Sequence, residues 1–353
     1  MSSYIRGLDG LRAIAVGTVF VAHAFSNVFA NVIANPFGVD LFFTLSGFLI
    51  TIGVRTDLEK RGRISLRLFY LRRILRLAPA LILVVACFLL IAAATDDLQN
   101  SLLPSLAALT YTMNWARAFS YPIDPQLGHT WSLSIEEQFY LLWPLLLASA
   151  YRWGGRNTAL ACATGLAVLS LSWRLYLLHA GAGVDRIYNG FDTHADALLI
   201  GCALALLRQS PATRFWFVPV AILMVVFFFA PWIAWLSLPS TIVALAGAWL
   251  ISICWSGSNS RFIDLLEFSP IRYIGRISYG IYLWHWPILM ELWRLGYPNY
   301  GIETAAMALI LTLCCAVISF HLVERPILRF KNRLNSYDRA APTVERHREL
   351  LSA

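Results

Sequence analysis

Long, uninterrupted apolar runs constrain the fold of this chain more than any other feature. Ten of them fall near residues 11–33, 37–54, 77–94, 134–151, 158–178, 191–207, 215–230, 236–255, 273–293 and 304–323. A helix needs about twenty apolar residues to cross a bilayer, where only helices and closed barrels satisfy their backbone hydrogen bonds. With 58% hydrophobic residues, the chain is too apolar for a soluble protein. The runs predict an all-α polytopic membrane protein with about ten transmembrane helices.

Basic residues gather on one side of these predicted spans. With a cytoplasmic N-terminus, all but four of the 28 lysines and arginines fall in cytoplasmic segments, the exceptions being Arg117, Arg174, Arg186 and Arg294. Basic residues near span ends resist translocation. The pattern predicts that both termini are cytoplasmic and that the protein is a multi-pass component of the bacterial inner membrane. The same pattern accounts for the net charge of +8 without a nucleic-acid partner. Membrane lipid is the partner that we expect instead.

The segments between the predicted spans are too short to form a second soluble domain. We expect residues 1–330 to form one membrane domain and residues 331–353 a basic cytoplasmic tail, with the run 11–33 retained rather than cleaved. The longest outside segment, 95–133, contains an apolar stretch at 102–113 that we expect along the membrane interface. The six cysteines lie in apolar stretches without metal-ligand spacing, which predicts no metal site and no permanently bound cofactor.

Arginines mark the cytoplasmic half of the predicted bundle. Arg12 and His23 are eleven residues apart, which places them on nearly one face of a helix and about 16 Å apart along its axis. The segment FYLRRILRLAP adds Arg72, Arg73 and Arg76 at the cytoplasmic start of the third span. Guanidinium groups bind phosphate oxygens in bidentate fashion, so the pattern suits a long, thin substrate such as acyl-CoA. The alternative is that these arginines only enforce topology.

Acidic and imidazole groups mark the outer half. Asp40 begins the second span in GVDLFFTLSGF, Glu136 and Glu137 lie in GHTWSLSIEEQFYLLWP, and FDTHADALLIG carries Asp192, His194 and Asp196. His285 lies in SYGIYLWHWPIL before Pro287. Ionisable groups inside a bilayer are costly and usually face a bundle interior or a water-filled cavity. Packing histidines, helix caps and an aromatic belt are the structural alternatives for these residues.

These blocks, taken in order, resemble the acyltransferase family 3 membrane proteins over roughly residues 4–330. The resemblance rests on YIRGLDGLRAIAV with His23, GVDLFFTLSGFLIT, FYLRRILRLAP, HTWSLSIEEQFYLLWP, ISYGIYLWHWP and HLVERP. Arg12 and His23 match the family's arginine and histidine, Arg73 and Arg76 its arginine pair, and Glu136 its glutamate. Where His194 stands, many relatives carry arginine. The resemblance implies a ten-helix domain that takes a short acyl group from cytoplasmic CoA to an acceptor hydroxyl.

We therefore expect an O-acyltransferase that uses acetyl-CoA or another acyl-CoA as donor and a cell-surface or lipid-linked glycan as acceptor. His23 is the expected base, oriented by Asp40 or Glu136, with His285 as the second candidate base. Arg12, Arg72, Arg73 and Arg76 are expected to bind the donor phosphates. A covalent intermediate through Ser46 or Ser132 is an alternative to direct transfer. A macrolide-like small acceptor, a transporter or flippase, and a structural member of a polysaccharide-assembly complex are the other interpretations.

Overall fold

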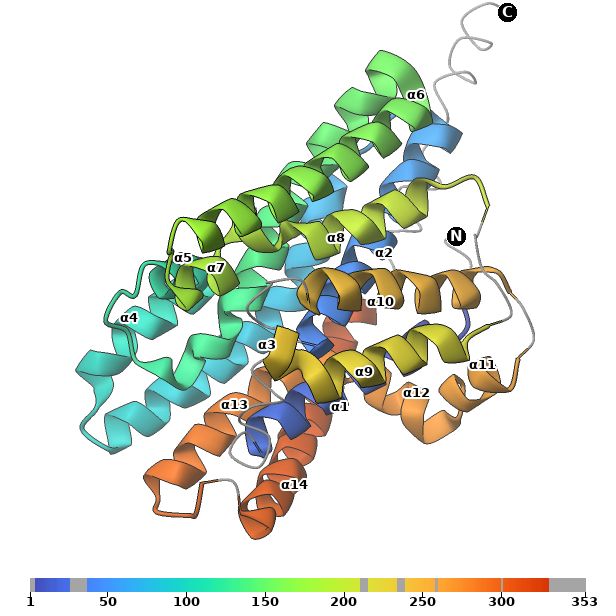
Figure 1. Ribbon diagram of the computed structural model, residues 1–353. Helices are drawn as coiled ribbons and strands as arrows, with labels where there is room; N and C mark the ends of the chain where they lie inside the picture. The colour runs from blue at the N-terminus through green and yellow to red at the C-terminus, as the bar shows by residue number, and fades with distance from the viewer. Residues whose placement is uncertain are drawn as a thin grey trace, which may run out of the picture.

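The computed structural model describes residues 4–25, 37–209, 215–233, 239–257, 260–299 and 301–329, and within these ranges it contains helices and no strand (Figure 1). The prediction of an all-α protein is therefore confirmed for this part of the chain. In chain order the helices are α1 (Leu8–Ala24), α2 (Phe37–Arg61), α3 (Leu66–Ala94), α4 (Leu98–Leu109), α5 (Met113–Ala118), η1 (Pro125–Thr130), α6 (Trp131–His179), α7 (Val184–Asn189), α8 (Phe191–Leu206), α9 (Phe217–Ile233), α10 (Pro239–Trp255), α11 (Arg261–Leu266), α12 (Ser269–Arg276), α13 (Ser278–Arg294) and α14 (Ile302–Ser319), which continues into a π-helical turn (Phe320–Glu324).

Each predicted span overlaps one of these helices. The spans 134–151 and 158–178 are the two halves of α6, which is kinked where Gly155 adopts a φ of 70°. Figure 1 shows α6 folding back at this kink, and the contact between α5 and α7 agrees, because these helices lie near its two ends. By length and composition, four described helices can cross a membrane, namely Phe37–Arg61, Leu66–Ala94, Pro125–His179 and Ile302–Arg329. The number of crossings and the side of the termini remain predictions.

The helices extend beyond the apolar runs. The segment 55–76 between the predicted spans 37–54 and 77–94, expected on the cytoplasmic side, is non-helical only at residues 62–65, because α2 continues to Arg61 and α3 begins at Leu66. Arginine, lysine and glutamate are good helix formers, and ion pairs of Arg55 with Glu59 (3.6 Å) and Arg61 with Asp57 (3.9 Å) support the last turns of α2. Hydropathy detects only lipid-compatible segments, so it misses these turns. The predicted tail 331–353 and the end of the span 11–33 lie outside the described residues.

The predicted outer segment 95–133 also folds into helices. It contains α4, α5 and η1, and leucines exposed on α4 continue the apolar surface expected at 102–113. The short helix η1 is fixed to α13, because the indole N–H of Trp286 donates to the carbonyl of Pro125 at 2.8 Å. This contact brings the residues just before α6 next to the middle of α13.

A carboxylate from the opposite end of the chain fixes the start of α1. Glu267, between α11 and α12, accepts hydrogen bonds from the backbone N–H of Gly7 at 2.7 Å and from the hydroxyl of Tyr4 at 2.9 Å. Partial burial raises the pKa of Glu267, but these donors, together with the charges of Arg272 and Arg6, lower it by more, so its pKa lies below the usual value. The ionised carboxylate therefore holds α1, which carries both Arg12 and His23, in a fixed position.

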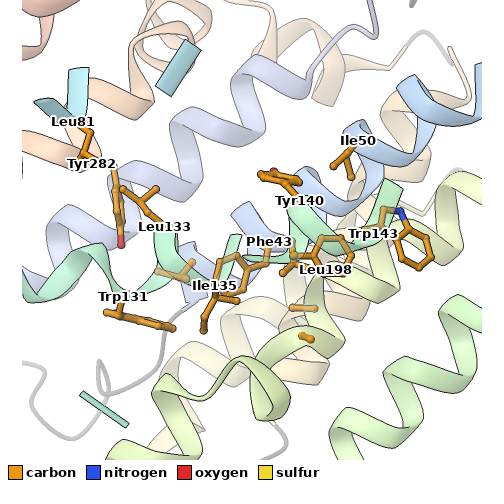
Figure 2. Packing of buried hydrophobic residues seen from close by; sticks show 14 of the residues in the cluster. Phe43, Ile50, Leu81, Trp131, Leu133, Ile135, Tyr140, Trp143, Leu198 and Tyr282 are labelled. Atoms are coloured by element: carbon orange, nitrogen blue, oxygen red, sulfur yellow. The ribbon is translucent and has the colours of Figure 1, made fainter. Parts of the chain in front are cut away.

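Helices α2 and α8 are in backbone contact. A Cβ atom at Gly47 would lie 1.9 Å from the carbonyl oxygen of Leu198, and one at Gly201 would lie 2.1 Å from the carbonyl oxygen of Thr44. Only glycine permits such an approach. Figure 2 shows part of the surrounding cluster of buried hydrophobic side chains, including Phe43, Trp143 and Leu198. The contact fixes α2 against α8 and thereby positions the polar residues that both helices carry.

Gly47→Ala should destabilise the protein, because the added methyl group would overlap the backbone of α8 and force the two helices apart. Overpacking of this kind costs about 1–3 kcal/mol or more. Gly53→Ala in the same helix is the matched control, since a Cβ there meets nothing within 4 Å. Thermal unfolding of the purified protein in detergent measures both effects. A melting temperature for Gly47→Ala equal to that of Gly53→Ala would contradict the tight α2–α8 contact.

Candidate active site

Six arginines line one cavity, which we call the arginine cavity. Its volume is about 340 Å³, and its arginines come from α1, α2, α3 and the α2–α3 turn: Arg12, Arg61, Arg63, Arg72, Arg73 and Arg76. All four arginines predicted to bind the donor are among them. Glu136 also lines the cavity, as do the hydroxyl-bearing residues Ser46, Ser132, Tyr140 and Tyr282. The cavity thus combines a strongly basic wall with a wall of hydrogen-bonding side chains.

The cavity's arginines differ in how their charge is balanced. Arg12 pairs with Asp9 at 3.1 Å, and Arg73 pairs with Glu137 at 3.0 Å while its guanidinium lies 3.1 Å from the centre of the Tyr140 ring. Arg76 has no carboxylate within ion-pair distance among the residues that the structure describes. A cation that faces a cavity without a counter-ion is suited to an anionic ligand. Because α3 begins at Leu66, Arg72, Arg73 and Arg76 lie on a regular helix rather than in a loop.

Glu136 faces the arginine cavity. Its carboxylate accepts hydrogen bonds from the hydroxyls of Ser46 and Tyr140. These bonds join α2 to α6 at the cavity wall. No described hydrogen bond links Glu136 to His23, so the predicted orienting role of Glu136 has no direct contact to carry it.

A chain of hydroxyl groups leads from the cavity to η1. Tyr282 donates its single hydroxyl hydrogen to the carbonyl of His129 at 2.7 Å, and the hydroxyl of Ser132 lies 2.6 Å from the Tyr282 oxygen. Because Tyr282 has no second hydrogen to give, Ser132 must be the donor in that bond. The Ser132 hydroxyl therefore has no base to remove its proton, which disfavours it as the nucleophile of a covalent intermediate.

His23 and His285 form a hydrogen-bonded pair next to this chain. The ring atoms His23 Nδ1 and His285 Nε2 are 2.8 Å apart, and the two rings are inclined by only 5°. His285 Nδ1 lies 2.6 Å from the carbonyl oxygen of Tyr282. A carbonyl can only accept, so His285 carries its hydrogen on Nδ1 and accepts at Nε2. His23 then donates from Nδ1, which leaves the lone pair of a neutral His23 on Nε2.

His129 completes a cluster that we call the histidine cluster: His23, His129 and His285. Its ring lies 5.5 Å from that of His285, only 3% of the residue is exposed, and neither ring nitrogen has a hydrogen-bond partner in the described structure. The carbonyl of Leu283, which Pro287 leaves without a helical donor, is nearby but outside hydrogen-bond geometry. Sequence reasoning missed His129. Its place in GHTW, seven residues before Glu136, was the only available signal.

Asp40 contacts His194 rather than His23. Its Oδ1 lies 2.7 Å from His194 Nε2, and His194 Nδ1 lies 2.8 Å from the carbonyl oxygen of Tyr188. Asp40 and His194 are almost fully buried. The contacts of Asp40 and Glu136 therefore do not support the prediction that either residue orients His23. Asp40 contacts His194, and the hydrogen-bond partner of His23 is His285.

The other acidic residues of FDTHADALLIG are also paired. Asp196 and Arg174, both almost fully buried, form an ion pair at 2.9 Å. Asp192 pairs with Arg186 at 2.5 Å and accepts from the indole of Trp173 at 2.7 Å. These pairs join α6, α7 and α8 and neutralise two of the four arginines predicted outside the cytoplasm.

Within the described ranges, no group of three or more histidine, cysteine, aspartate or glutamate side chains has the geometry of a metal site. The six cysteines are free. The predicted absence of a metal and of a resident cofactor stays a prediction.

Comparison with known proteins places the chain in a family. The acyltransferase domain family matches residues 5–321, so the chain belongs to the acyltransferase family that its motifs resemble. It is 34% identical to the peptidoglycan O-acetyltransferase OatA of Listeria monocytogenes over 92% of this chain and 56% of that protein. It is 32% identical to the putative peptidoglycan O-acetyltransferase YrhL of Bacillus subtilis and 33% identical to the O-acetyltransferase OatA of Staphylococcus aureus, again over 92% of this chain and 55% and 57% of those proteins.

The chain spans little more than half the length of these curated relatives. No solved structure matches it.

Proposed function

We propose that this protein is an integral-membrane O-acyltransferase of the bacterial inner membrane, which transfers an acyl group, acetyl in the simplest case, from cytoplasmic acyl-CoA to a hydroxyl of a cell-surface or lipid-linked glycan. One observation carries the proposal. The arginine cavity is lined by Tyr282, whose backbone carbonyl holds His285 and, through it, His23. A single residue, Tyr282, thus connects the arginine cavity to the histidine pair, in which a neutral His23 has its lone pair on Nε2.

The shape of the donor fits this arrangement. Acyl-CoA carries its phosphates at one end and its thioester at the end of the long pantetheine arm. Arg12 and His23 lie on the same helix, about 16 Å apart along its axis by the helical rise. That separation is comparable to the reach of an extended pantetheine arm, so phosphates at the arginines would leave the thioester near His23.

The chemistry follows from the hydrogen bonds of the histidine pair. The acceptor hydroxyl gives its proton to His23 Nε2 as its oxygen attacks the thioester carbonyl carbon. The tetrahedral intermediate then collapses, the carbon–sulfur bond breaks, and protonated His23 returns the proton to the departing CoA thiolate. His285 accepts from His23 Nδ1 throughout and holds the ring in the required tautomer. His285 is thus a positioning residue, and Arg12, Arg72, Arg73 and Arg76 bind the donor phosphates.

The relatives support a glycan acceptor, since the names of two of them include peptidoglycan O-acetyltransferase. A glycan carries many hydroxyls of the kind this reaction requires. Polysaccharide-assembly proteins are further proposed partners. Transfer of radiolabel from acetyl-CoA to a glycan supports the enzyme, whereas movement of glycan without labelling would support a transporter.

His23→Ala should abolish transfer of radiolabelled acetyl from acetyl-CoA to peptidoglycan glycan strands in membrane vesicles, because no other base accepts the proton. His285→Ala should lower kcat about 100-fold or more, as expected when a base loses its orientation. His285→Gln should recover part of this loss, since its amide oxygen can accept from His23 Nδ1. His23→Gln should stay inactive. Equal activity of the two glutamine variants, or wild-type turnover of His23→Ala, would refute these roles.

Arg76→Ala should weaken CoA binding about 10-fold or more, because a charge-assisted bond to phosphate is lost, and Arg76→Lys should restore only part of it. Arg67→Ala is the matched control, since Arg67 is exposed on the same helix and does not line the cavity. Competition with CoA and dephospho-CoA measures the effect. If Arg76→Ala and Arg67→Ala bind CoA equally well, the arginine cavity is not the phosphate site.

A further inference from the structure

Arg117 is a cation on the buried face of a short helix. The buried residues of α5 are Met113, Asn114 and Ala118, and Arg117 follows Met113 and Asn114 by four and three residues, on the same face. Its guanidinium packs on η1, because a Cβ atom at Gly128 would lie 2.6 Å from its Nη1. The glycine of GHTW therefore allows the charge to approach the residue before His129.

The charge of Arg117 is not balanced by any carboxylate within ion-pair distance among the described residues. Its buried Nε has no hydrogen-bond partner there. The other predicted outer arginines differ in having a carboxylate partner: Arg174 is paired with Asp196, Arg186 with Asp192 and Arg294 with Glu291. A guanidinium on the buried face of a helix costs folding free energy when it has no counter-ion. Such a group calls for a functional explanation.

The groups around Arg117 are those of the histidine cluster. Its Nη1 packs against Gly128, the next residue along the chain is His129, and the His129 ring lies 5.5 Å from that of His285. These neighbours carry no negative charge that offsets it. In the proposed reaction, negative charge develops beside His23 on one atom, the oxygen of the thioester carbonyl, as the acceptor attacks.

We propose that Arg117 is a catalytic residue that binds this oxyanion. The inference rests on the proposed acyl transfer and adds the group that stabilises its tetrahedral intermediate. As the acceptor oxygen bonds to the carbonyl carbon, the carbonyl electron pair moves to oxygen, and the guanidinium donates a hydrogen bond to it. When the carbon–sulfur bond breaks, the pair returns and the bond to Arg117 weakens. The oxyanion exists only in the tetrahedral intermediate and in the transition states next to it. The interaction with Arg117 therefore accelerates the chemical step and does not strengthen the binding of either substrate.

An acidic group on the acceptor is the other anion that such a cation suits. The contact of Arg117 with the catalytic end of the site, rather than with an exposed surface, favours the oxyanion. The two ligands predict different kinetics. Oxyanion binding acts on kcat with every acceptor, whereas binding of an acidic acceptor acts on KM and only with acceptors that carry the acid.

The experiment measures acetyl transfer from radiolabelled acetyl-CoA by the full-length protein in membrane vesicles. Two acceptors are compared, peptidoglycan glycan strands with free carboxylates and the same strands after amidation. Arg117→Gln should lower kcat about 100-fold to 1000-fold with both acceptors, as for loss of an oxyanion donor, and should leave both KM values within about 3-fold. Arg117→Lys should give an intermediate kcat. Arg294→Gln, an exposed arginine outside the cluster, should match wild type.

Free guanidinium ion adds a readout that a structural role would not move. In Arg117→Ala it should restore part of kcat, and it should have no effect on His23→Ala.

If Arg117→Gln loses CoA affinity through misfolding, the Arg117→Lys variant decides the question. A lower kcat of Arg117→Lys at unchanged KM supports the proposal. Unchanged kcat in a folded variant, or a rise in KM only for the carboxylated acceptor, would overturn it. An active Arg117→Gln beside an inactive His23→Ala rejects the oxyanion role alone, whereas absence of transfer by wild type rejects the proposed function.

Discussion

The hydrogen bond between His23 and His285 is the interaction on which the site depends. It joins α1 to α13, residues 262 positions apart, and its direction is set by the carbonyl of Tyr282, which can only accept. That single constraint places the lone pair of a neutral His23 on Nε2. Two further contacts hold the helices that carry the pair: Glu267 fixes the start of α1, and Trp286 joins η1 to the middle of α13.

Charge balance separates structural from functional groups in this bundle. Asp196 with Arg174 and Asp40 with His194 are buried and paired with each other, so each charge or imidazole has a partner that joins two helices. Arg76 and Arg117 have no carboxylate partner among the described residues; Arg76 lines the arginine cavity, and Arg117 packs against Gly128, next to His129. Isolated charges in a low-dielectric interior are costly, so such residues mark where anionic substrate or transition-state charge is expected.

The sequence predicted the helices better than the contacts between them. Each apolar run overlaps a helix, because lipid imposes hydrophobicity over a fixed length, but the runs missed the charged turns that carry α2 to Arg61 and begin α3 at Leu66. The motifs identified His23, His285 and the donor arginines as candidate site residues. They did not reveal that Asp40 pairs with His194, or that His129 and Arg117 lie beside the histidines. Those contacts join distant segments, and a single sequence carries no periodicity that encodes them.

Transfer from cytoplasmic acyl-CoA to a cell-surface glycan, as proposed, requires that donor and acceptor reach His23 from opposite faces of the membrane. The direct measurement uses sealed, oriented vesicles with radiolabelled acetyl-CoA supplied only on the face of the arginine cavity and glycan supplied only on the other. The account predicts labelled glycan under this arrangement and none when the two substrates are exchanged. If transfer occurs only when both substrates share the arginine-cavity side, the acyl group does not cross the bundle and the account is wrong.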